Sequence, residues 1–361
     1  MNNVTRRSFI VFTALLSLSI SAMALAQPAK PIVYVLSTGG TIAGSGSSAT
    51  DLSNYKSGAI LGEQLVKAVP QIAQVADVRV EQIVNVNSSD ITIENWLTLA
   101  KRIQAIIKDT PAVAGFVITS GTNTLEETAY FLNLTVRSDK PVVVVGSMRP
   151  STAISADGPL NLLNAVRVAS SSEARGKGTL IVLNDEINSA RDATKTNTLR
   201  VETFKSPELG LLGYVDEDKV SFYHSSTKRH TANSEFDVTN LTALPKVTIL
   251  YSYIDPDASM IQAAITSGAK GIVFAGTGNG GLSVMEETVL KEVAAMPAAT
   301  RPALVRSSRV GNGRVTATAE YDALGVIPSD TLNAQKARIL LMLALTKTSD
   351  PKEIRRMFSE Y

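Results

Sequence analysis

Two threonines stand in glycine-containing turns that directly follow predicted strands. Thr41 comes after the apolar segment 32–37, and Thr122 comes after the apolar segment 116–119. In open α/β sheets, ligands bind beyond the carboxyl ends of the strands, so we expect the two hydroxyls to face one crevice. A threonine hydroxyl can attack a carbonyl carbon only when a partner takes its proton. The pair therefore indicates nucleophilic chemistry, although a single Gly-Thr turn is more typical of an ordinary connection.

Two further residues, Lys195 and Tyr55, do not stand out in the sequence by themselves. A lysine can accept a proton from a hydroxyl where burial lowers the pKa of its amine. Tyr55 lies in segment 43–58, whose glycines and serines are typical of a lid loop that orders over a substrate. In isolation, a solvated surface lysine and a surface tyrosine are the simpler interpretations of these two residues.

The elements that would position these residues alternate between short β-branched runs and amphipathic stretches. This alternation predicts an α/β fold with a mainly parallel sheet flanked by helices. Strands are expected at 32–37, 78–86, 116–119, 141–146 and 179–183, and helices at 60–69, 93–108, 125–134 and 160–170.

The polar segment 223–245 interrupts the alternation and is interpreted as a linker. Because 361 residues exceed the usual size of one domain, we expect a larger N-terminal α/β catalytic domain over 27–222 and a smaller C-terminal α/β domain over 246–361. In the second domain, strands are expected at 247–251, 271–275 and 303–307, and helices at 258–267, 282–295 and 333–346.

The first 26 residues have the pattern of a secretory signal peptide. Arg6 and Arg7 precede an apolar run that is too short for a stable membrane anchor, and a small-x-small cleavage site ends at Ala26. Cleavage there predicts a periplasmic mature protein. The paired arginines also fit a twin-arginine signal, so the Sec and twin-arginine export routes both stay open.

Composition argues against several classes of protein. Removal of residues 1–26 takes the formal charge from +2 to 0, so the mature chain has no electrostatic footprint for nucleic acid or for an anionic membrane. Cysteine is absent and only His224 and His230 occur, which supplies little for a metal site and no thiolate nucleophile. The glycine turn at 39–40 matches neither GxGxxG nor GxxxxGK[ST], so no nucleotide cofactor is implied.

Eight segments, taken in order along the chain, resemble the bacterial type II L-asparaginases, which include the glutaminase-asparaginases. The resemblance spans essentially the whole mature chain and implies an amidohydrolase that acts on a small molecule, L-asparagine, with L-glutamine as a second candidate. The segments are TGGTIAG at 38–44, TSGTNTLEETAYFL at 119–132, VVGSMRPSTAISADGPLNL at 144–162, DATKTNT at 192–198, KRHTANSEFDV at 228–238, AGTGNGG at 275–281, VRSSRV at 305–310 and TLNAQKARIL at 331–340.

The resemblance also implies roles for the matching residues. Thr41 is then the nucleophile that forms an acyl-enzyme, and Tyr55 assists it from the lid. Thr122 and Lys195 form a second catalytic group, in which the lysine supports a threonine–water relay. The family's homotetramer is implied as the assembly, with Asn279 and Glu320 lent to a site across a subunit boundary. The implied substrate-binding residues are Gly40, Ser88, Ser89, Thr122, Asn123, Asn279 and Glu320.

Asn123 departs from the family pattern, which has an aspartate at this position that contacts the substrate amino group. Replacing a charge-assisted hydrogen bond, worth roughly 1.5–3 kcal/mol, by a neutral one predicts a loss of about ten- to a hundredfold in activity on L-asparagine. Ser120 replaces the family histidine, Ser89 replaces a longer side chain that bears on the preference between asparagine and glutamine, and Ala334 replaces a proline with little expected effect.

Other functions stay open at this point. A glutaminase-asparaginase of broad specificity is one, because discrimination of a single methylene is worth only about 1–3 kcal/mol. Asn123 also fits a non-catalytic periplasmic amino-acid binder, which would bind L-asparagine without releasing ammonia. A nucleotide-dependent enzyme is a distant third and would bind NAD or ATP.

Overall fold

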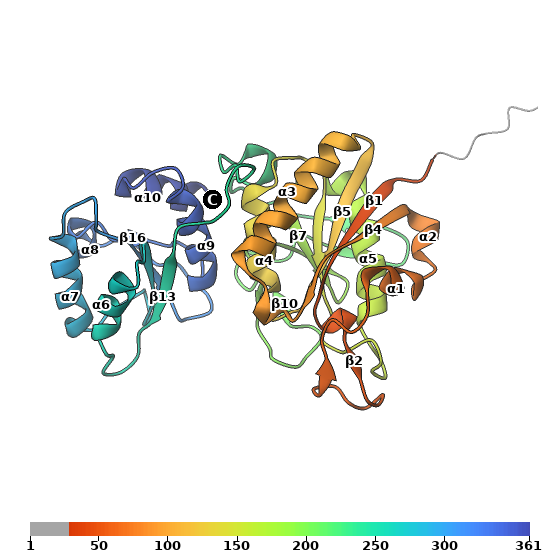
Figure 1. The fold of residues 1–361 in the computed structure, drawn as a ribbon, viewed down its shortest axis with the longest axis horizontal. Helices are drawn as coiled ribbons and strands as arrows, with labels where there is room; N and C mark the ends of the chain where they lie inside the picture. The colour runs from red at the N-terminus through yellow and green to blue at the C-terminus, as the bar shows by residue number, and fades with distance from the viewer. Residues whose placement is uncertain (1–28) are drawn as a thin grey trace, which may run out of the picture. The chain divides into compact units, whose positions relative to one another are not determined.

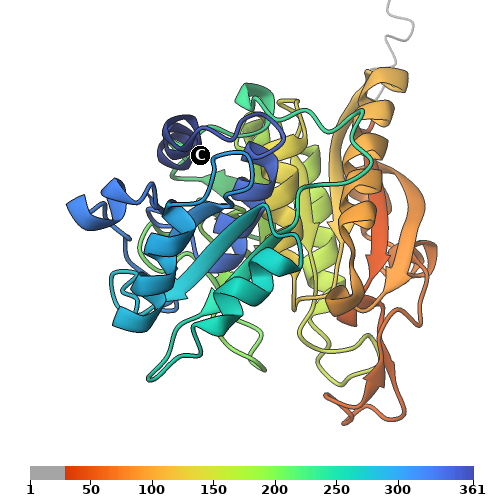
Figure 2. The same ribbon diagram turned by 60° about the vertical axis from the view of Figure 1, so that its left-hand side comes forward.

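A computed structural model describes residues 29–361 (Figure 1). The predicted signal peptide and its cleavage point after Ala26 lie outside this range. Two sheets, one of eight strands and one of four, organise the described chain, and helices cover both of them (Figure 2). This confirms the predicted pair of α/β units with mainly parallel strands. No helix within residues 29–361 combines the length and the apolar composition needed to cross a membrane.

The larger sheet has the strand order β12-β11-β8-β7-β6-β5-β1-β4. From β4 to β7 all neighbouring strands are parallel, and the remaining pairs are antiparallel. The strands are β1 (Ile32–Gly39), β4 (Asp77–Val86), β5 (Val113–Thr119), β6 (Val142–Val145), β7 (Thr179–Leu183), β8 (Glu186–Ser189), β11 (Gly213–Val215) and β12 (Val220–Phe222).

The antiparallel half of this sheet was not predicted from the sequence. It begins with a hairpin in which Leu183 pairs with Glu186, so its loop has only two residues, Asn184 and Asp185. Both have positive φ, 52° and 62°, as a type I′ turn requires. The usual sequence signal for such a turn ends in glycine, and its absence here conceals the hairpin.

Side chains on successive strand residues point to opposite faces of the larger sheet. Val33 and Val35 pack into one apolar cluster, together with helices α1 (Gly62–Lys67), α2 (Ile72–Val75) and α5 (Gly158–Ser170). Tyr34 and Leu36 pack into another, with helices α3 (Ile93–Asp109) and α4 (Leu125–Thr135). Because both faces are covered, the strands appear in the sequence as continuous apolar runs.

The smaller sheet is parallel throughout, in the order β13-β14-β15-β16. In β14, Ile272 and Phe274 pack into a cluster with α6 and α7, whereas Val273 and Ala275 join a cluster that includes α9. The elements are β13 (Val247–Tyr251), β14 (Gly271–Gly276), β15 (Ala303–Ser308) and β16 (Ile327–Pro328), with α6 (Ser259–Thr266), α7 (Val284–Ala294), α8 (Ala319–Ala323), α9 (Ala334–Ala344) and α10 (Pro351–Glu360).

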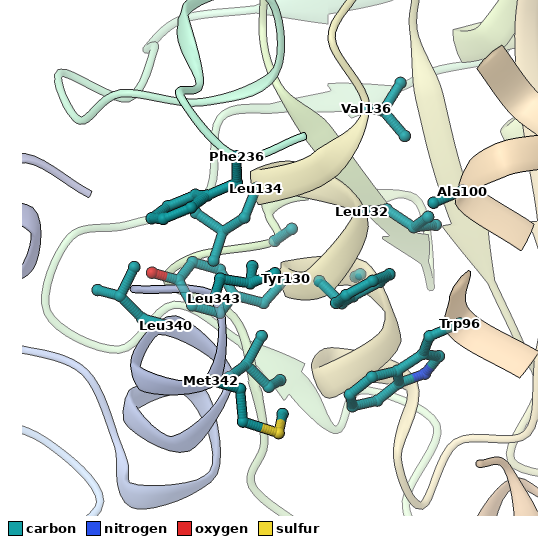
Figure 3. Packing of buried hydrophobic residues seen from close by; sticks show 14 of the residues in the cluster. Trp96, Ala100, Tyr130, Leu132, Leu134, Val136, Phe236, Leu340, Met342 and Leu343 are labelled. Atoms are coloured by element: carbon teal, nitrogen blue, oxygen red, sulfur yellow. The ribbon is translucent and has the colours of Figure 1, made fainter. Parts of the chain in front are cut away.

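Residues 223–245 contain no strand and only one short 3-10 helix, Thr231–Asn233. The segment is nevertheless packed, since Phe236 and Val238 are buried and belong to the same cluster as Leu134 of α4 (Figure 3). The backbone N–H of Glu235 donates to the Tyr361 hydroxyl at 2.8 Å. The polar composition that indicated a linker therefore conceals two core residues.

Helix α4 is covered by α3 and by α9 (Figure 3). Trp96 of α3 stacks on Phe131 of α4 with ring centroids 5.1 Å apart, and its indole N–H donates to Thr128 at 2.9 Å. Leu340 and Leu343 of α9 are fully buried in the same cluster. Packing therefore holds α4 in place, and the residues directly before it, which include Thr122, are attached to a fixed helix.

Truncation of Leu340 to alanine tests this packing. We expect Leu340→Ala to lower the free energy of unfolding by about 2–5 kcal/mol, because it removes buried methyl groups and leaves a cavity. Leu199→Ala is the matched control, since Leu199 is 73% exposed, and it should change stability by less than about 0.5 kcal/mol. Urea denaturation measures both values, and equal costs would contradict the described packing.

Candidate active site

Thr41 begins a short 3-10 helix, Thr41–Ala43, directly after β1. The residue is buried, and its hydroxyl oxygen lies 2.7 Å from the hydroxyl oxygen of Tyr55. Tyr55 belongs to β3 (Tyr55–Lys56), which pairs with β2 (Ser45–Gly46) in a small antiparallel hairpin. In Figures 1 and 2 this hairpin projects from the end of the larger sheet where β1 terminates. The segment predicted to be a lid thus carries its tyrosine back onto the threonine.

A second loop, which follows β6, holds this hairpin in place. The Ser151 hydroxyl donates to the carbonyl of Gly44 at 2.7 Å, and the N–H of Gly46 donates to the Thr152 hydroxyl at 2.8 Å. The Tyr55 ring lies directly on Gly44, where a Cβ would meet the ring Cδ2 at 2.8 Å. Glycine at this position is therefore a condition for the contact between Tyr55 and Thr41.

Thr122 and Lys195 form a second hydroxyl–amine pair. The Lys195 ammonium nitrogen donates to the Thr122 hydroxyl at 2.9 Å and to the side-chain oxygen of Asn123 at 3.1 Å. Lys195 lies on β9 (Thr194–Lys195), which pairs with β10 (Phe204–Lys205). Burial lowers the pKa of Lys195, and the negative charge of Glu126 opposes this by raising it. Lys195 is therefore positioned to exchange a proton with Thr122.

The turns that carry the two threonines touch through their glycines. Gly40 has φ +81°, and a Cβ built on it would lie 2.1 Å from the backbone nitrogen of Gly121. A Cβ on Gly121 would in turn meet the Ser88 hydroxyl oxygen at 2.7 Å. Neither position accepts a side chain without displacement of the other turn. This backbone contact places the groups of Thr41 and Thr122 at one carboxyl edge of the sheet.

The orientation of the Asn123 side chain is set by its two partners. Its oxygen accepts from Lys195, and its amide nitrogen donates toward the Ser89 hydroxyl at 3.4 Å. The Asn123 backbone N–H donates to the buried Ser88 hydroxyl at 3.2 Å, and the Thr124 hydroxyl donates to the Ser88 carbonyl at 2.7 Å. Ser88, Ser89 and Asn123 thus form one polar surface next to Thr122.

Asn279 and Glu320 lie elsewhere in the chain, in the part built on the smaller sheet. The Asn279 side chain donates to the Thr316 hydroxyl at 2.7 Å and accepts from the Thr316 backbone N–H at 2.9 Å. Glu320 is exposed in the first turn of α8. Among residues 29–361, no hydrogen bond joins either side chain to Thr41 or Thr122. Within one chain, the described partners of Asn279 are therefore in its own part of the chain and not among the two threonine groups.

A buried ion pair that the sequence did not predict lies near the strand of Lys195. Glu126 follows Thr122 by four residues, and its carboxylate lies 3.7 Å from the ammonium of Lys336 on α9. Lys336 stands between Gln335 and Arg338 in the first turns of α9, so the sequence carries no clear signal for this pair. In the part of the chain that is described, no cluster of three or more histidine, aspartate or glutamate side chains is arranged to hold a metal ion.

Known proteins resemble this chain over most of its length. Residues 32–228 match the family model "Asparaginase, N-terminal", and residues 246–358 match "Glutaminase/Asparaginase C-terminal domain". The chain is 52% identical to L-asparaginase 2 of Bacillus subtilis over 94% of this chain and 89% of that protein. It is 48% identical to the glutaminase-asparaginase of Pseudomonas fluorescens over 91% of this chain and 90% of the relative.

A solved structure also resembles the described fold. The crystal structure of a probable cytoplasmic L-asparaginase from Campylobacter jejuni is 50% identical, with a TM-score of 0.89 over 92% of this chain and all of the other. Two paired threonines on touching glycine turns, both family models and relatives at about half identity lead to the same assignment. The chain belongs to the asparaginase family.

Proposed function

We propose that the mature chain hydrolyses the side-chain amide of L-asparagine to L-aspartate and ammonia through a threonine acyl-enzyme. The observation that carries this proposal is the 2.7 Å contact between the Thr41 and Tyr55 hydroxyl oxygens, which gives the nucleophile a partner for its proton. The printed names of the relatives, L-asparaginase and glutaminase-asparaginase, support the same reaction class.

The proposed reaction has two halves. In the first, the Thr41 oxygen attacks the amide carbon, its proton passes by way of Tyr55 to the leaving nitrogen, and the C–N bond breaks to release ammonia and leave an ester on Thr41. In the second, water adds to the ester carbon, and L-aspartate leaves as Thr41 regains its proton. Thr122 and Lys195 are proposed to relay the proton of the attacking water. Backbone N–H groups in the glycine turns can stabilise the oxyanion, although that of Gly40 already donates to the Val86 carbonyl at 2.9 Å.

Substrate binding is proposed for the polar surface formed by Ser88, Ser89 and Asn123. We further propose that Asn279 and Glu320 complete the site of a neighbouring subunit in a homotetramer, as the family resemblance implies. Light scattering on the purified mature chain should give four times the mass of one chain. A monomer with full activity would contradict this assembly.

We also propose domain bounds at 27–222 and 246–361, with the linker 223–245 between them. The proposed compartment is the periplasm. A Haemophilus influenzae relative, 48% identical over 92% of this chain, carries the name "Probable L-asparaginase periplasmic". The Campylobacter jejuni neighbour is named cytoplasmic, so export of this chain rests on its predicted signal peptide.

Removal of the Thr41 hydroxyl tests the proposed nucleophile. Thr41→Val keeps the shape of the side chain, and we expect ammonia release from L-asparagine to fall by at least ~10³-fold with the fold unchanged. Thr50→Val makes the same change on the same lid segment, where the hydroxyl is exposed and contacts only Ser48, and should leave activity near that of the wild type. Retention of activity by Thr41→Val would exclude Thr41 as the nucleophile.

Asn123→Asp tests the consequence of the neutral amide. Its oxygen would point a negative charge at both Lys195 and a substrate ammonium, so we expect kcat/KM for L-asparagine to rise about ten- to a hundredfold. The carboxylate would also favour the Lys195 ammonium and raise the pKa of that residue. The wild type and Asn123→Asp should therefore be compared at a pH above the rising limb of both pH–rate profiles.

The same experiment separates the remaining functions. A wild-type chain that binds L-asparagine but releases no ammonia, with release appearing in Asn123→Asp, would identify an amino-acid binder built on this scaffold. Release from L-glutamine at a rate similar to that from L-asparagine would identify a glutaminase-asparaginase. Unchanged kcat/KM in Asn123→Asp would show that the amide does not limit the reaction.

A further inference from the structure

Glu126 is a buried carboxylate that none of the proposed chemical steps uses. It is 6% exposed and lies in the first turn of α4, four residues after Thr122. The ammonium of Lys336 lies 3.7 Å from one carboxylate oxygen. Side-chain amides of Asn333 and Gln335 donate to the carboxylate at 3.2 and 3.4 Å. The carboxylate is therefore held in place by α9 and the residues at its start.

The other partner of Glu126 is the strand that carries Lys195. The Thr194 hydroxyl donates to Glu126 at 3.0 Å, and Thr194 directly precedes Lys195 on β9. Lys336, the counter-ion of Glu126, also donates to the backbone carbonyls of Arg191, at 2.8 Å, and Ala193. The ion pair thus holds the segment just before Lys195 through Arg191, Ala193 and Thr194. One carboxylate joins the segment of Thr122 to the segment of Lys195.

Glu126 also supplies the negative charge that acts on Lys195. The lysine's hydrogen-bond partners, Thr122 and Asn123, are both neutral. Burial lowers the pKa of Lys195 and Glu126 raises it. Other charged groups on nearby elements are paired with one another: Asp192 with Arg191 at 2.9 Å, and Lys205 of β10 with Glu186.

A purely stabilising role explains this arrangement poorly. Burial of two charges costs desolvation free energy that their attraction hardly exceeds, and apolar side chains of the same volume often stabilise a protein as well or better. Glu126 reaches the strand of Lys195 through its hydrogen bond from Thr194. The geometry therefore favours a role for Glu126 in the proton-transfer group.

We propose that Glu126 is a positioning residue for Lys195, which fixes the distance between Lys195 and Thr122 through Thr194 and sets the charge felt by the lysine. The catalytic consequence rests on the proposed amidohydrolase function. The electrostatic claim concerns only the folded chain, so it can be tested without turnover, whereas the positional claim is tested by turnover.

The charge is tested by the titration of Lys195 itself. Acetic anhydride modifies only the neutral amine, so the rate of Lys195 acetylation against pH, followed by peptide mass spectrometry, gives the midpoint of its titration. Glu126→Gln keeps an acceptor for Thr194 but removes the charge that favours the ammonium. We expect its midpoint to lie at lower pH than in the wild type, because the neutral amine is then favoured.

Glu127→Gln is the matched control, one residue along the same helix turn. Its carboxyl is partly buried, its pKa is raised by burial, and it does not act on Lys195. Its midpoint should equal that of the wild type. A Glu126→Gln midpoint equal to both would overturn the electrostatic part of the proposal. The rising limb of kcat/KM should move in the same direction as the midpoint.

The positional role is tested by Thr194, which also serves if Glu126→Gln fails to fold. Thr194→Val removes the donor to Glu126 and changes no charge. We expect kcat to fall roughly 5- to 10-fold, as for loss of one buried hydrogen bond, with the titration midpoint unchanged and with recovery in Thr194→Ser. Wild-type kcat in Thr194→Val would refute the positional claim. A wild-type chain that releases no ammonia would refute the amidohydrolase function, while the acetylation midpoints would still decide the charge.

Discussion

The contact between Gly40 and Gly121 is the constraint on which the rest of the site depends. Two loops that follow neighbouring parallel strands meet there backbone to backbone, at a separation that leaves no room for a single Cβ. Everything reactive is attached next to this contact, Thr41 on one side and Thr122 on the other. Because glycine costs backbone entropy on folding, such a contact persists only where the packed strands on both sides impose it.

Each hydroxyl at this contact then receives a partner from a different part of the chain. Tyr55 arrives on a hairpin that needs Gly44 beneath its ring, and Lys195 arrives on a two-residue strand that pairs only with β10. Neither element is stable alone, since hairpins this short have little apolar surface to bury. The loop around Ser151 holds the first, and the Glu126–Lys336 pair holds the second. The positions of Tyr55 and Lys195 thus depend on supporting residues and not on the stability of the short strands that carry them.

Much of the fold could be predicted from the sequence, because strands buried on both faces, such as β6, appear as uninterrupted apolar runs. The hairpin at Asn184 was missed because its turn lacks glycine, and the buried residues of 223–245 were missed because polar neighbours surround them. At the site, Thr41 and Thr122 follow from strand ends alone, whereas Tyr55 and Lys195 needed the family resemblance. Glu126 could not be predicted, because an acidic pair in the first turn of a helix is favourable there for the helix dipole alone.

The Glu126–Lys336 pair also gives the C-terminal part of the chain a role in the proposed chemistry within a single subunit. Helix α9 packs on β14 with one set of residues and on α4 with another, and Lys336 extends from it to the backbone before Lys195. A shift of α9 would therefore move Lys195 relative to Thr122 and would leave the Thr41 group where it is. The two hydroxyl groups differ in this respect, since the proposed nucleophile Thr41 and Tyr55 belong wholly to the N-terminal part, whereas the proposed proton-transfer group of Thr122 and Lys195 depends on both parts.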